Sequence, residues 1–368
     1  MFDFETAAKN GIVNEGNVSR LKKMFSKLRE GKPVTIGAIG GSITEGARST
    51  KPEFRYHSVL GEWMKDYFKN PNITVINAGV GATNSLYGLF RADRDILCFE
   101  PDFVIVDYCC NDFLTDEYMK NEYEMLVRKI LSAPFEPAVM LYSFSKKDGT
   151  NTQSAHTPVA PFYDIPALSY RDAYYPEIEK GRLEWSDISP DEVHPNDIGH
   201  RAAAILIEEF LKAVDRGEAG DDSPYHLRED SLNGFMFKNP RLLGAGDITP
   251  VDFGDFEVAK TPYYRVPLGF SAKKAGRPIV FKVKCANIGL AYLRWNTNDF
   301  GRALMTIDGE EFLLDGHFPA DWGGFMLTKI YAANLENTEH TISVKLLDDK
   351  PEGSTGEKFI FCYLLLAD

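Results

Sequence analysis

A serine that follows two glycines is the first candidate for chemistry in the sequence. The apolar run Val34–Ile39 has the length and composition of a buried strand, and Gly40 and Gly41 separate it from Ser42. Two glycines permit a tight turn, which would leave Ser42 exposed above the end of the strand with its own backbone N–H facing an oxyanion. No glycine stands two residues after Ser42, so this is not the GxSxG turn of the α/β-hydrolases. A phosphate-binding loop and an ordinary turn are equally compatible with the pattern.

Much further along the chain, an aspartate and a histidine stand three residues apart. The spacing of Asp191 and His194 places both on one helical-type turn, where the carboxylate can accept the imidazole Nδ1–H. That hydrogen bond would leave Nε2 free to take a proton from Ser42. A surface aspartate that caps a turn beside a solvated histidine is the structural alternative. One His and one Asp are too few ligands for zinc, so we expect no metal here.

Two further motifs carry groups that can stabilise an oxyanion. Asn111 follows the apolar run Phe103–Tyr108, and its side-chain amide can donate a hydrogen bond there, although an Asn-Asp pair is also a common turn. The loop 77–84 (NAGVGATN) follows another strand-like run, and Gly81 or Ala82 within it can expose a backbone N–H. The same glycines are also consistent with a loop that has no role in chemistry.

The elements that must position these motifs alternate between strands and helices up to about residue 218. Apolar runs of strand length lie at Val34–Ile39, Ile73–Ile76, Phe103–Tyr108 and Ala138–Phe144. Helical patterns lie at Val18–Glu30, His57–Asn70, Ser85–Phe99, Asp116–Ser132 and Asn196–Arg216. Such alternation predicts an α/β domain with a parallel sheet covered on both faces, in which ligands bind beyond the carboxyl ends of the strands.

The character of the sequence changes at Gly217. Residues 217–226 (GEAGDDSPYH) are polar and turn-rich, as in a linker, and long helical periodicity is absent after them. Strand-like runs then follow at Pro278–Val283, Ala291–Trp295, Arg302–Ile307, Met326–Tyr331, Thr341–Leu347 and Lys358–Leu366. This spacing predicts an all-β sandwich or jelly roll. We therefore expect one domain at residues 1–218 and a second at residues 225–368.

The composition narrows the class of protein. A chain of 368 residues that is 44% hydrophobic and 26% charged is typical of a globular protein with two or three domains. A net charge of −13 argues against nucleic-acid binding and against anionic lipid as a partner, although acidity also simply favours solubility. The N-terminus does not resemble a signal peptide, and no apolar run approaches the roughly 20 residues of a membrane helix. The five cysteines, with Cys109 next to Cys110, favour free thiols in a reducing compartment. We expect a cytoplasmic protein that needs no cofactor.

Taken together, the four motifs resemble the four blocks of the SGNH hydrolases, also called the GDSL esterases. The order is the same, namely serine, glycine loop, asparagine and Asp/His, and the resemblance covers roughly residues 33–215. It implies a flavodoxin-like three-layer α/β fold, with Ser42 as nucleophile, His194 as base and Asp191 as the carboxylate that orients it. The oxyanion would be held by the Asn111 amide, the backbone N–H of Ser42 and one N–H from the glycine loop.

The sequence departs from the family pattern at two positions. The Asp that precedes the family's serine is Gly41 here, and because that Asp is no member of the triad, we expect the chemistry to survive. The loop glycine five residues after the Asn is Ala82 here. A backbone N–H is all that is needed, so Ala82 can serve if its φ is allowed, and Gly81 is the neighbouring candidate.

The all-β half bears on the substrate. A β-sandwich after an esterase domain resembles a carbohydrate-binding module, and Trp322 lies in a glycine-rich turn where its ring can stack on a sugar. We therefore expect removal of O-acetyl groups from oligo- or polysaccharides of the hemicellulose type, such as mannan or xylan. An esterase or thioesterase for small acyl substrates is the first alternative, and a sugar-binding protein without catalysis is the second. A homo-oligomer is compatible with all three.

Overall fold

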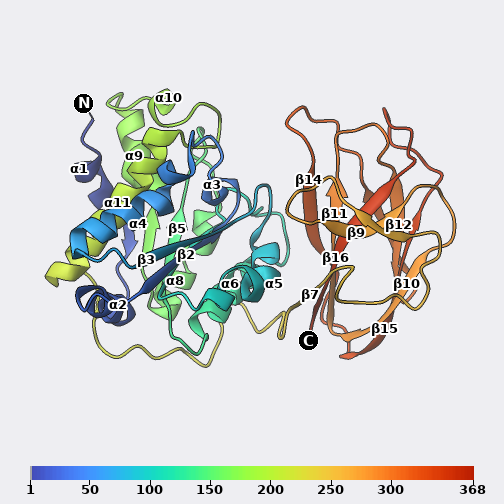
Figure 1. Ribbon diagram of the computed structural model, residues 1–368, viewed down its shortest axis with the longest axis horizontal. Coiled ribbons are helices and arrows are strands. Elements are labelled where there is room, and N and C mark those ends of the chain that lie inside the picture. The colour runs from blue at the N-terminus through green and yellow to red at the C-terminus, as the bar shows by residue number, and fades with distance from the viewer. Residues whose placement is uncertain (1) are drawn as a thin grey trace. The chain divides into compact units, whose positions relative to one another are not determined.

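The computed structural model describes residues 2–368 and divides them into two compact units. The first unit ends at Gly234 and the second comprises Phe235–Asp368. Figure 1 shows helices and a sheet in the first unit and strands almost alone in the second. No helix within residues 2–368 has the length and apolar character that crossing a membrane requires.

A six-stranded sheet forms the centre of the first unit. Its order is β1-β6-β5-β4-β2-β3, and all neighbours are parallel except β1, which runs antiparallel to β6. The five parallel strands have the flavodoxin-like order, which confirms the predicted fold class. The strands are β1 (Ile12–Asn14), β2 (Val34–Gly40), β3 (Ile73–Gly79), β4 (Phe103–Asp107), β5 (Ala138–Ser143) and β6 (Ala167–Ser169).

Helices cover both faces of this sheet. In Figure 1, α2, α4 and α11 lie on one side of it and α5 and α6 on the other. The helices are α1 (Phe4–Ala8), α2 (Ser19–Arg29), α3 (Ser42–Glu45), α4 (Tyr56–Phe68), α5 (Ser85–Asp95), α6 (Met119–Leu131), α7 (Gln153–His156), α8 (Val159–Tyr163), α9 (Tyr170–Glu179), α10 (Trp185–Ile188) and α11 (Asp197–Arg216). The apolar stripes of α2, α4, α9 and α11 form one buried cluster with the strands, and buried apolar residues of α5 and α6, such as Leu89 and Ile130, lie outside that cluster.

Two helix boundaries differ from the sequence-based expectation. Helix α5 ends at Asp95, and Leu97–Phe99 forms a separate 3₁₀ turn. Helix α6 begins at Met119 and not at Asp116, because the Asp116 carboxylate accepts the backbone N–H of Tyr118 at 3.1 Å and so forms a local turn. Helix α11 ends as predicted, since Gly217 follows it with a φ of 72°.

The second unit consists of two antiparallel sheets around a common apolar core. One sheet has the order β10-β15-β12-β13, and the other has β14-β11-β16-β9-β8 with β7 paired to β16. The strands are β7 (Arg241–Leu243), β8 (Glu257–Lys260), β9 (Leu268–Ala272), β10 (Ile279–Cys285), β11 (Asn287–Arg294), β12 (Arg302–Ile307), β13 (Glu310–Asp315), β14 (Phe325–Ala332), β15 (Thr338–Leu346) and β16 (Phe359–Ala367). The predicted all-β sandwich is therefore confirmed.

The polar segment after α11 belongs to the first unit. A buried carboxylate on α6, that of Glu124, accepts the backbone N–H groups of Leu232 and Asn233, each at 2.7 Å, and the hydroxyl of Ser231 at 2.9 Å. The unit boundary consequently lies at Gly234, later in the chain than the change in composition at Gly217.

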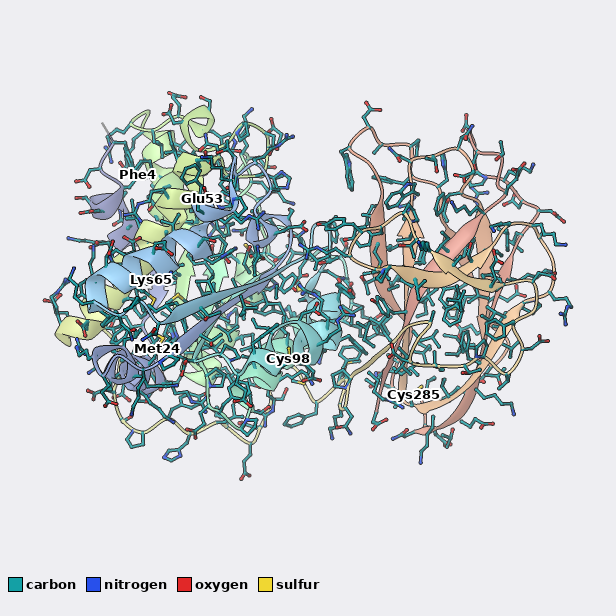
Figure 2. All side chains as sticks on the ribbon, viewed as in Figure 1. Phe4, Met24, Glu53, Lys65, Cys98 and Cys285 are labelled. Carbon is teal, nitrogen blue, oxygen red and sulfur yellow. The ribbon has the colours of Figure 1, made fainter. Side chains whose placement is uncertain are left out.

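All five cysteines are free thiols. Cys109, Cys110, Cys285 and Cys362 are buried, whereas Cys98 is exposed on the 3₁₀ turn after α5. Figure 2 labels Cys98 in the first unit and Cys285 in the second.

Candidate active site

The four sequence motifs lie at one end of the parallel sheet. Ser42 begins α3 directly after β2, Ala82 follows β3, and Asn111 follows β4. Strands β3 and β4 are the two neighbours of β2 in the sheet, so their carboxyl ends flank Ser42. The loop between α10 and α11 contributes His194. This is the edge at which doubly wound sheets bind ligands.

Ser42, His194 and Asp191 are connected by hydrogen bonds. The Ser42 Oγ lies 2.9 Å from His194 Nε2, and His194 Nδ1 lies 3.1 Å from Asp191 Oδ2. With a proton on Nδ1, the imidazole donates to the carboxylate and presents the Nε2 lone pair to the serine hydroxyl. All three side chains are only partly buried. A substrate can therefore reach the serine without unfolding of the site.

The turn that holds Asp191 and His194 is not helical, which corrects the sequence-based interpretation. The chain forms a bend in which Asp191 Oδ1 accepts the backbone N–H groups of Val193 at 2.8 Å and His194 at 2.7 Å. The carboxylate thus builds the turn that places its own partner. Burial opposes ionisation of Asp191, but these two N–H donors and the Arg48 guanidinium outweigh it and hold the pKa of the carboxyl below its usual value.

The Asn111 side chain lies directly against Gly41. A Cβ atom added at Gly41 would stand 2.0 Å from Asn111 Oδ1 and 3.0 Å from Nδ2. Among residues 2–368, no protein acceptor is within hydrogen-bonding distance of the Asn111 amide. The departure from the family's Asp at position 41 therefore has a steric reason, because only glycine leaves room for Asn111 in this position.

The two candidate N–H donors of the glycine loop differ in their hydrogen bonds. The Gly81 N–H donates to the Glu45 carboxylate at 2.9 Å. The Ala82 N–H donates to no protein atom in the described chain, and neither does that of Ser42. Ala82 has a φ of +55°, the left-handed conformation that glycine adopts without strain. Its N–H is the one that is available to a ligand.

Two residues of this site were missed by the sequence analysis. Arg48 donates from Nε to Asp191 Oδ2 at 2.8 Å, and Glu45 holds the Gly81 N–H. Neither contact is readable from the sequence, because the partners are 143 and 36 residues away. The only available signal was that both residues closely follow the serine motif.

Buried polar side chains next to the site form hydrogen bonds with one another. Thr44 donates to Asp107 Oδ2 at 3.1 Å, and burial raises the pKa of the Asp107 carboxyl to about 7. Asp112 accepts the N–H of Ser85 at 2.8 Å and lies 2.9 Å from His156 Nε2. Asp112 thereby connects the segment of Asn111 with the start of α5, three residues after Ala82.

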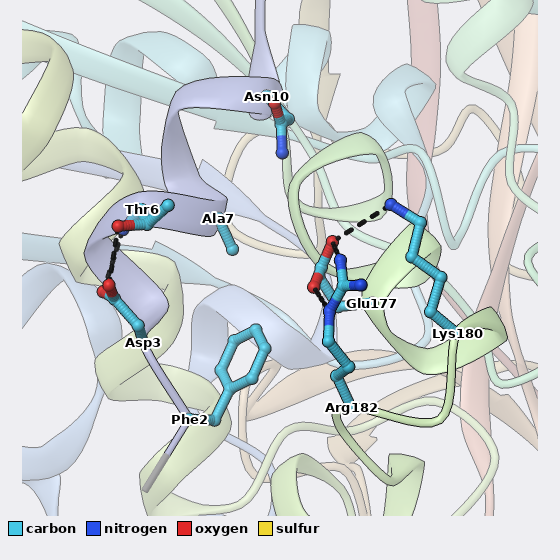
Figure 3. A pocket seen from close by; sticks show the side chains of 8 residues that line it. All are labelled: Phe2, Asp3, Thr6, Ala7, Asn10, Glu177, Lys180 and Arg182. Atoms are coloured by element: carbon cyan, nitrogen blue, oxygen red, sulfur yellow. Dashed lines mark hydrogen bonds and ion pairs between the residues drawn. The ribbon is translucent and has the colours of Figure 1, made fainter.

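A separate cavity lies away from this site, beside the N-terminal helix α1. It has a volume of about 660 Å³ and is lined by Phe2, Asp3, Thr6, Ala7, Asn10, Glu177, Lys180 and Arg182. Figure 3 shows Glu177 paired with both Lys180 and Arg182, whereas Asp3 is bonded to Thr6. The Thr6 hydroxyl in this cavity donates to the Asp3 carboxylate at 2.6 Å, and no histidine is among the lining residues given above, so the cavity lacks the serine–histidine arrangement found at Ser42.

Trp322 is exposed on the second unit, as its glycine-rich setting predicts. Its side chain is 63% exposed, and the rings of Phe318 and Phe325 pack against it at centroid distances of 5.0 and 5.6 Å. Trp295 is half-buried, and a Cβ atom at Gly324 would collide with its ring. The exposed indole is thus supported by other aromatic rings.

Comparison with known families agrees with this geometry. Residues 38–202 match the GDSL-like Lipase/Acylhydrolase family, and this stretch contains Ser42, Ala82, Asn111, Asp191 and His194. The chain belongs to this family, the SGNH hydrolases, and is a carboxylic ester hydrolase. Among curated protein sequences there is no match.

Two solved structures are similar to the chain over nearly its whole length. One is a two-domain esterase active on acetylated mannans, co-crystallised with mannopentaose, with 31% identity, a TM-score of 0.89 and 98% of each chain covered. The other is a two-domain esterase with the same described activity, with 32% identity, the same TM-score and the same coverage. Both units of the present chain therefore have counterparts in one known two-domain architecture.

Proposed function

We propose that this protein removes O-acetyl groups from hemicellulose-type oligo- or polysaccharides, with acetylated mannan fragments as the first candidate. The observation that carries the proposal is the similarity to a two-domain esterase active on acetylated mannans across 98% of both chains. The hydrogen-bonded series Ser42, His194 and Asp191 supports the same conclusion, because it is the arrangement that activates a serine for attack on an ester.

In the proposed mechanism Ser42 Oγ attacks the acetyl carbonyl carbon while His194 Nε2 takes the hydroxyl proton. The tetrahedral intermediate collapses when the sugar oxygen leaves with that proton, and an acetyl-serine ester remains. Water then attacks the acetyl group with His194 as base, which releases acetate and restores the serine. Asp191, ionised because its pKa is lowered, stabilises the imidazolium in both steps.

Three donors are suited to the oxyanion of these intermediates. We assign this role to the backbone N–H groups of Ser42 and Ala82 and to the Asn111 amide, none of which donates to another protein group in residues 2–368. Ala82 is preferred to Gly81 because the Gly81 N–H is already bonded to Glu45. Donors of this kind stabilise the charge that develops on the carbonyl oxygen.

The β-sandwich is proposed to act as a carbohydrate-binding module with Trp322 as a stacking surface. An exposed indole supported by Phe318 and Phe325 offers a rigid apolar face to a sugar ring. One such contact contributes on the order of 1 kcal/mol. That is enough to affect binding of an oligosaccharide without any effect on the ester chemistry.

A substrate panel tests the proposal. Acetate release is measured from acetylated mannan fragments, acetylated xylan fragments, p-nitrophenyl acetate and acetyl-CoA under identical conditions. We expect the mannan fragments to give the highest kcat/KM. A preference for acetyl-CoA would instead support the thioesterase alternative, and binding of the fragments without any acetate release would support the non-catalytic one.

A further inference from the structure

Arg48 occupies an unusual position beside the Asp/His turn. It follows the short helix α3 that begins with Ser42, and its own φ is +67°, in the left-handed region that residues with a Cβ rarely adopt. Its Nε donates to Asp191 Oδ2 at 2.8 Å. The same oxygen faces His194 Nδ1 at 3.1 Å. One carboxylate oxygen is therefore shared by a guanidinium and the imidazole.

A second contact keeps the two segments together. Thr50 donates to the Asp197 carboxylate from its backbone N–H at 2.8 Å and from its hydroxyl at 2.6 Å. The turn that follows the serine is thus joined to the Asp/His segment at two carboxylates, Asp191 and Asp197. Arg48, with its left-handed backbone, is itself the donor to Asp191, and Thr50, two residues later, is the donor to Asp197.

From this geometry we propose that Arg48 is a positioning residue for the ester hydrolysis, acting through Asp191. It orients Oδ2 toward His194 Nδ1 and withdraws part of the carboxylate's negative charge from the imidazole. The inference rests on the proposed roles of His194 and Asp191. It adds that the carboxylate partner of His194 is held from the turn that follows Ser42.

The physical basis is a competition for one charge. An imidazolium next to an isolated carboxylate is strongly stabilised, and an imidazolium whose carboxylate also serves a guanidinium is stabilised less. Loss of the guanidinium should therefore leave the whole carboxylate charge to the imidazole, and the acid limb of the pH profile should move to higher pH. The Arg48 side chain is 60% exposed, so solvent and salt weaken the effect.

The other charged or titratable groups near this turn do not share the same oxygen. Glu192 pairs with Lys147 at 3.0 Å. Asp197 is bonded to Thr50, and His200 on α11 is buried with a pKa lowered to about 4 by that burial. Lys147 is thus a surface cation on the loop after β5 that pairs with the Asp/His loop through a different carboxylate, and it provides a matched control.

The test compares Arg48→Gln, Arg48→Lys and Lys147→Gln in pH profiles of kcat/KM on p-nitrophenyl acetate. We expect Arg48→Gln to lower kcat several-fold and to move the acid limb upward by about 0.5 pH unit. Arg48→Lys keeps the charge and should hold the limb near its wild-type position, and Lys147→Gln should leave both quantities unchanged. In about 1 M salt the shift in Arg48→Gln should shrink, because an exposed charge is screened.

An unmoved acid limb in Arg48→Gln overturns the proposal, whatever happens to kcat, because a merely structural residue would lower activity without changing the profile. An equal shift in Lys147→Gln also overturns it, since a general surface-charge effect would then suffice. Ser42→Ala and His194→Ala separate this failure from that of the proposed function. If those variants lose turnover and Arg48→Gln keeps its limb, only the role of Arg48 is wrong.

Discussion

At the scale of single residues, the proposed role of Ser42 as nucleophile can be tested by a substitution that does not change the packing of the apolar core. It is partly exposed, and its Oγ has a hydrogen bond to His194. We expect Ser42→Ala to lower kcat on p-nitrophenyl acetate by roughly 10³-fold or more, because no other nucleophile stands in its place. The melting temperature, measured by circular dichroism, should stay within a few degrees of wild type. Wild-type turnover in a purified variant would remove Ser42 from the mechanism.

The contact between Gly41 and Asn111 predicts a second effect on kcat. A Cβ atom at Gly41 has no room beside the Asn111 amide, so Gly41→Ala should displace that donor. We expect kcat to fall about 10²-fold with little change in KM, as for loss of an oxyanion donor. Asn111→Ala should give a similar loss, and the double variant should be no worse than either single one. Additive losses would show that Gly41 acts by another route.

Residue-scale chemistry was only partly readable from the sequence. The motifs of Ser42, Asn111 and the Asp/His pair carry local signals, since each follows a strand or a fixed spacing. Our proposal of Ala82 over Gly81 as oxyanion donor comes from the structure and not from the sequence, because it depends on which N–H donates to the Glu45 carboxylate. No local sequence pattern indicates the role of Arg48, because its partner Asp191 is 143 residues away and is brought close only by folding.

At the scale of elements, the carboxyl end of β4 contains a buried acid. Burial raises the pKa of Asp107 from 3.8 to about 7. Between these values the unfolded chain releases the proton while the folded chain keeps it, so the free energy of unfolding falls as pH rises and is then constant above about 7. This is the opposite of the behaviour expected for Asp191, whose pKa is lowered on folding.

Asp107→Asn should remove that pH-dependent loss. The amide can still accept the Thr44 hydroxyl, and it has no charge to bury. We expect the variant to gain stability over wild type by about 2 kcal/mol more at about pH 8 than at about pH 5. Urea denaturation at the two pH values measures the difference. A difference that does not change with pH would mean that Asp107 is ionised in the folded protein across this range.

Elements with strong periodicity were predicted well, and short or polar ones were not. Helix α11 and strand β12 match their expected ranges closely, because each buries a regular apolar stripe. Strands β1 and β6 have three residues each, too few for a pattern. Strand β13 begins with two glutamates and pairs only with β12, so its sequence lacks the apolar alternation of a covered strand. The turn before it has φ values of 49° at Asp308 and 95° at Gly309, and Asp-Gly is a sequence that favours such a turn between paired strands.

At the scale of the whole molecule, Trp322 separates the contributions of the two units. If the β-sandwich contacts the glycan as proposed, Trp322→Ala should raise KM several-fold on an acetylated mannan oligosaccharide. Hydrolysis of p-nitrophenyl acetate should be almost unchanged, because that ester has no sugar chain. Equal losses on both substrates would indicate a structural role for Trp322. No loss on either would remove the main support for glycan binding at this position.

The division into two units was expected from the sequence, but residues 223–233 contact the first unit through several side chains, among them Arg128 and Glu124 on α6. Glu124 on α6 binds residues 231–233, which follow the linker-like stretch 217–226. A glutamate in an amphipathic helix normally reads as solvent-exposed, so its partners could not be predicted. Contacts of this kind join positions about 100 residues apart, so the sequence does not place the boundary at Gly234.

The unpartnered donors around Ser42 have a consequence for inhibition. Three donors lack protein partners in the described chain, namely the N–H groups of Ser42 and Ala82 and the Asn111 amide. They can therefore bind a tetrahedral anion without first breaking a hydrogen bond within the protein. The energy cost of the left-handed backbone at Ala82 is already included in the folding free energy. Binding of an anion does not add this cost again. A small alkylboronic acid, which forms a tetrahedral anion on a serine oxygen, should accordingly bind about 10²-fold or more tightly than a substrate of its size. Such a compound would contact only the first unit, so its affinity should be the same for wild type and for Trp322→Ala.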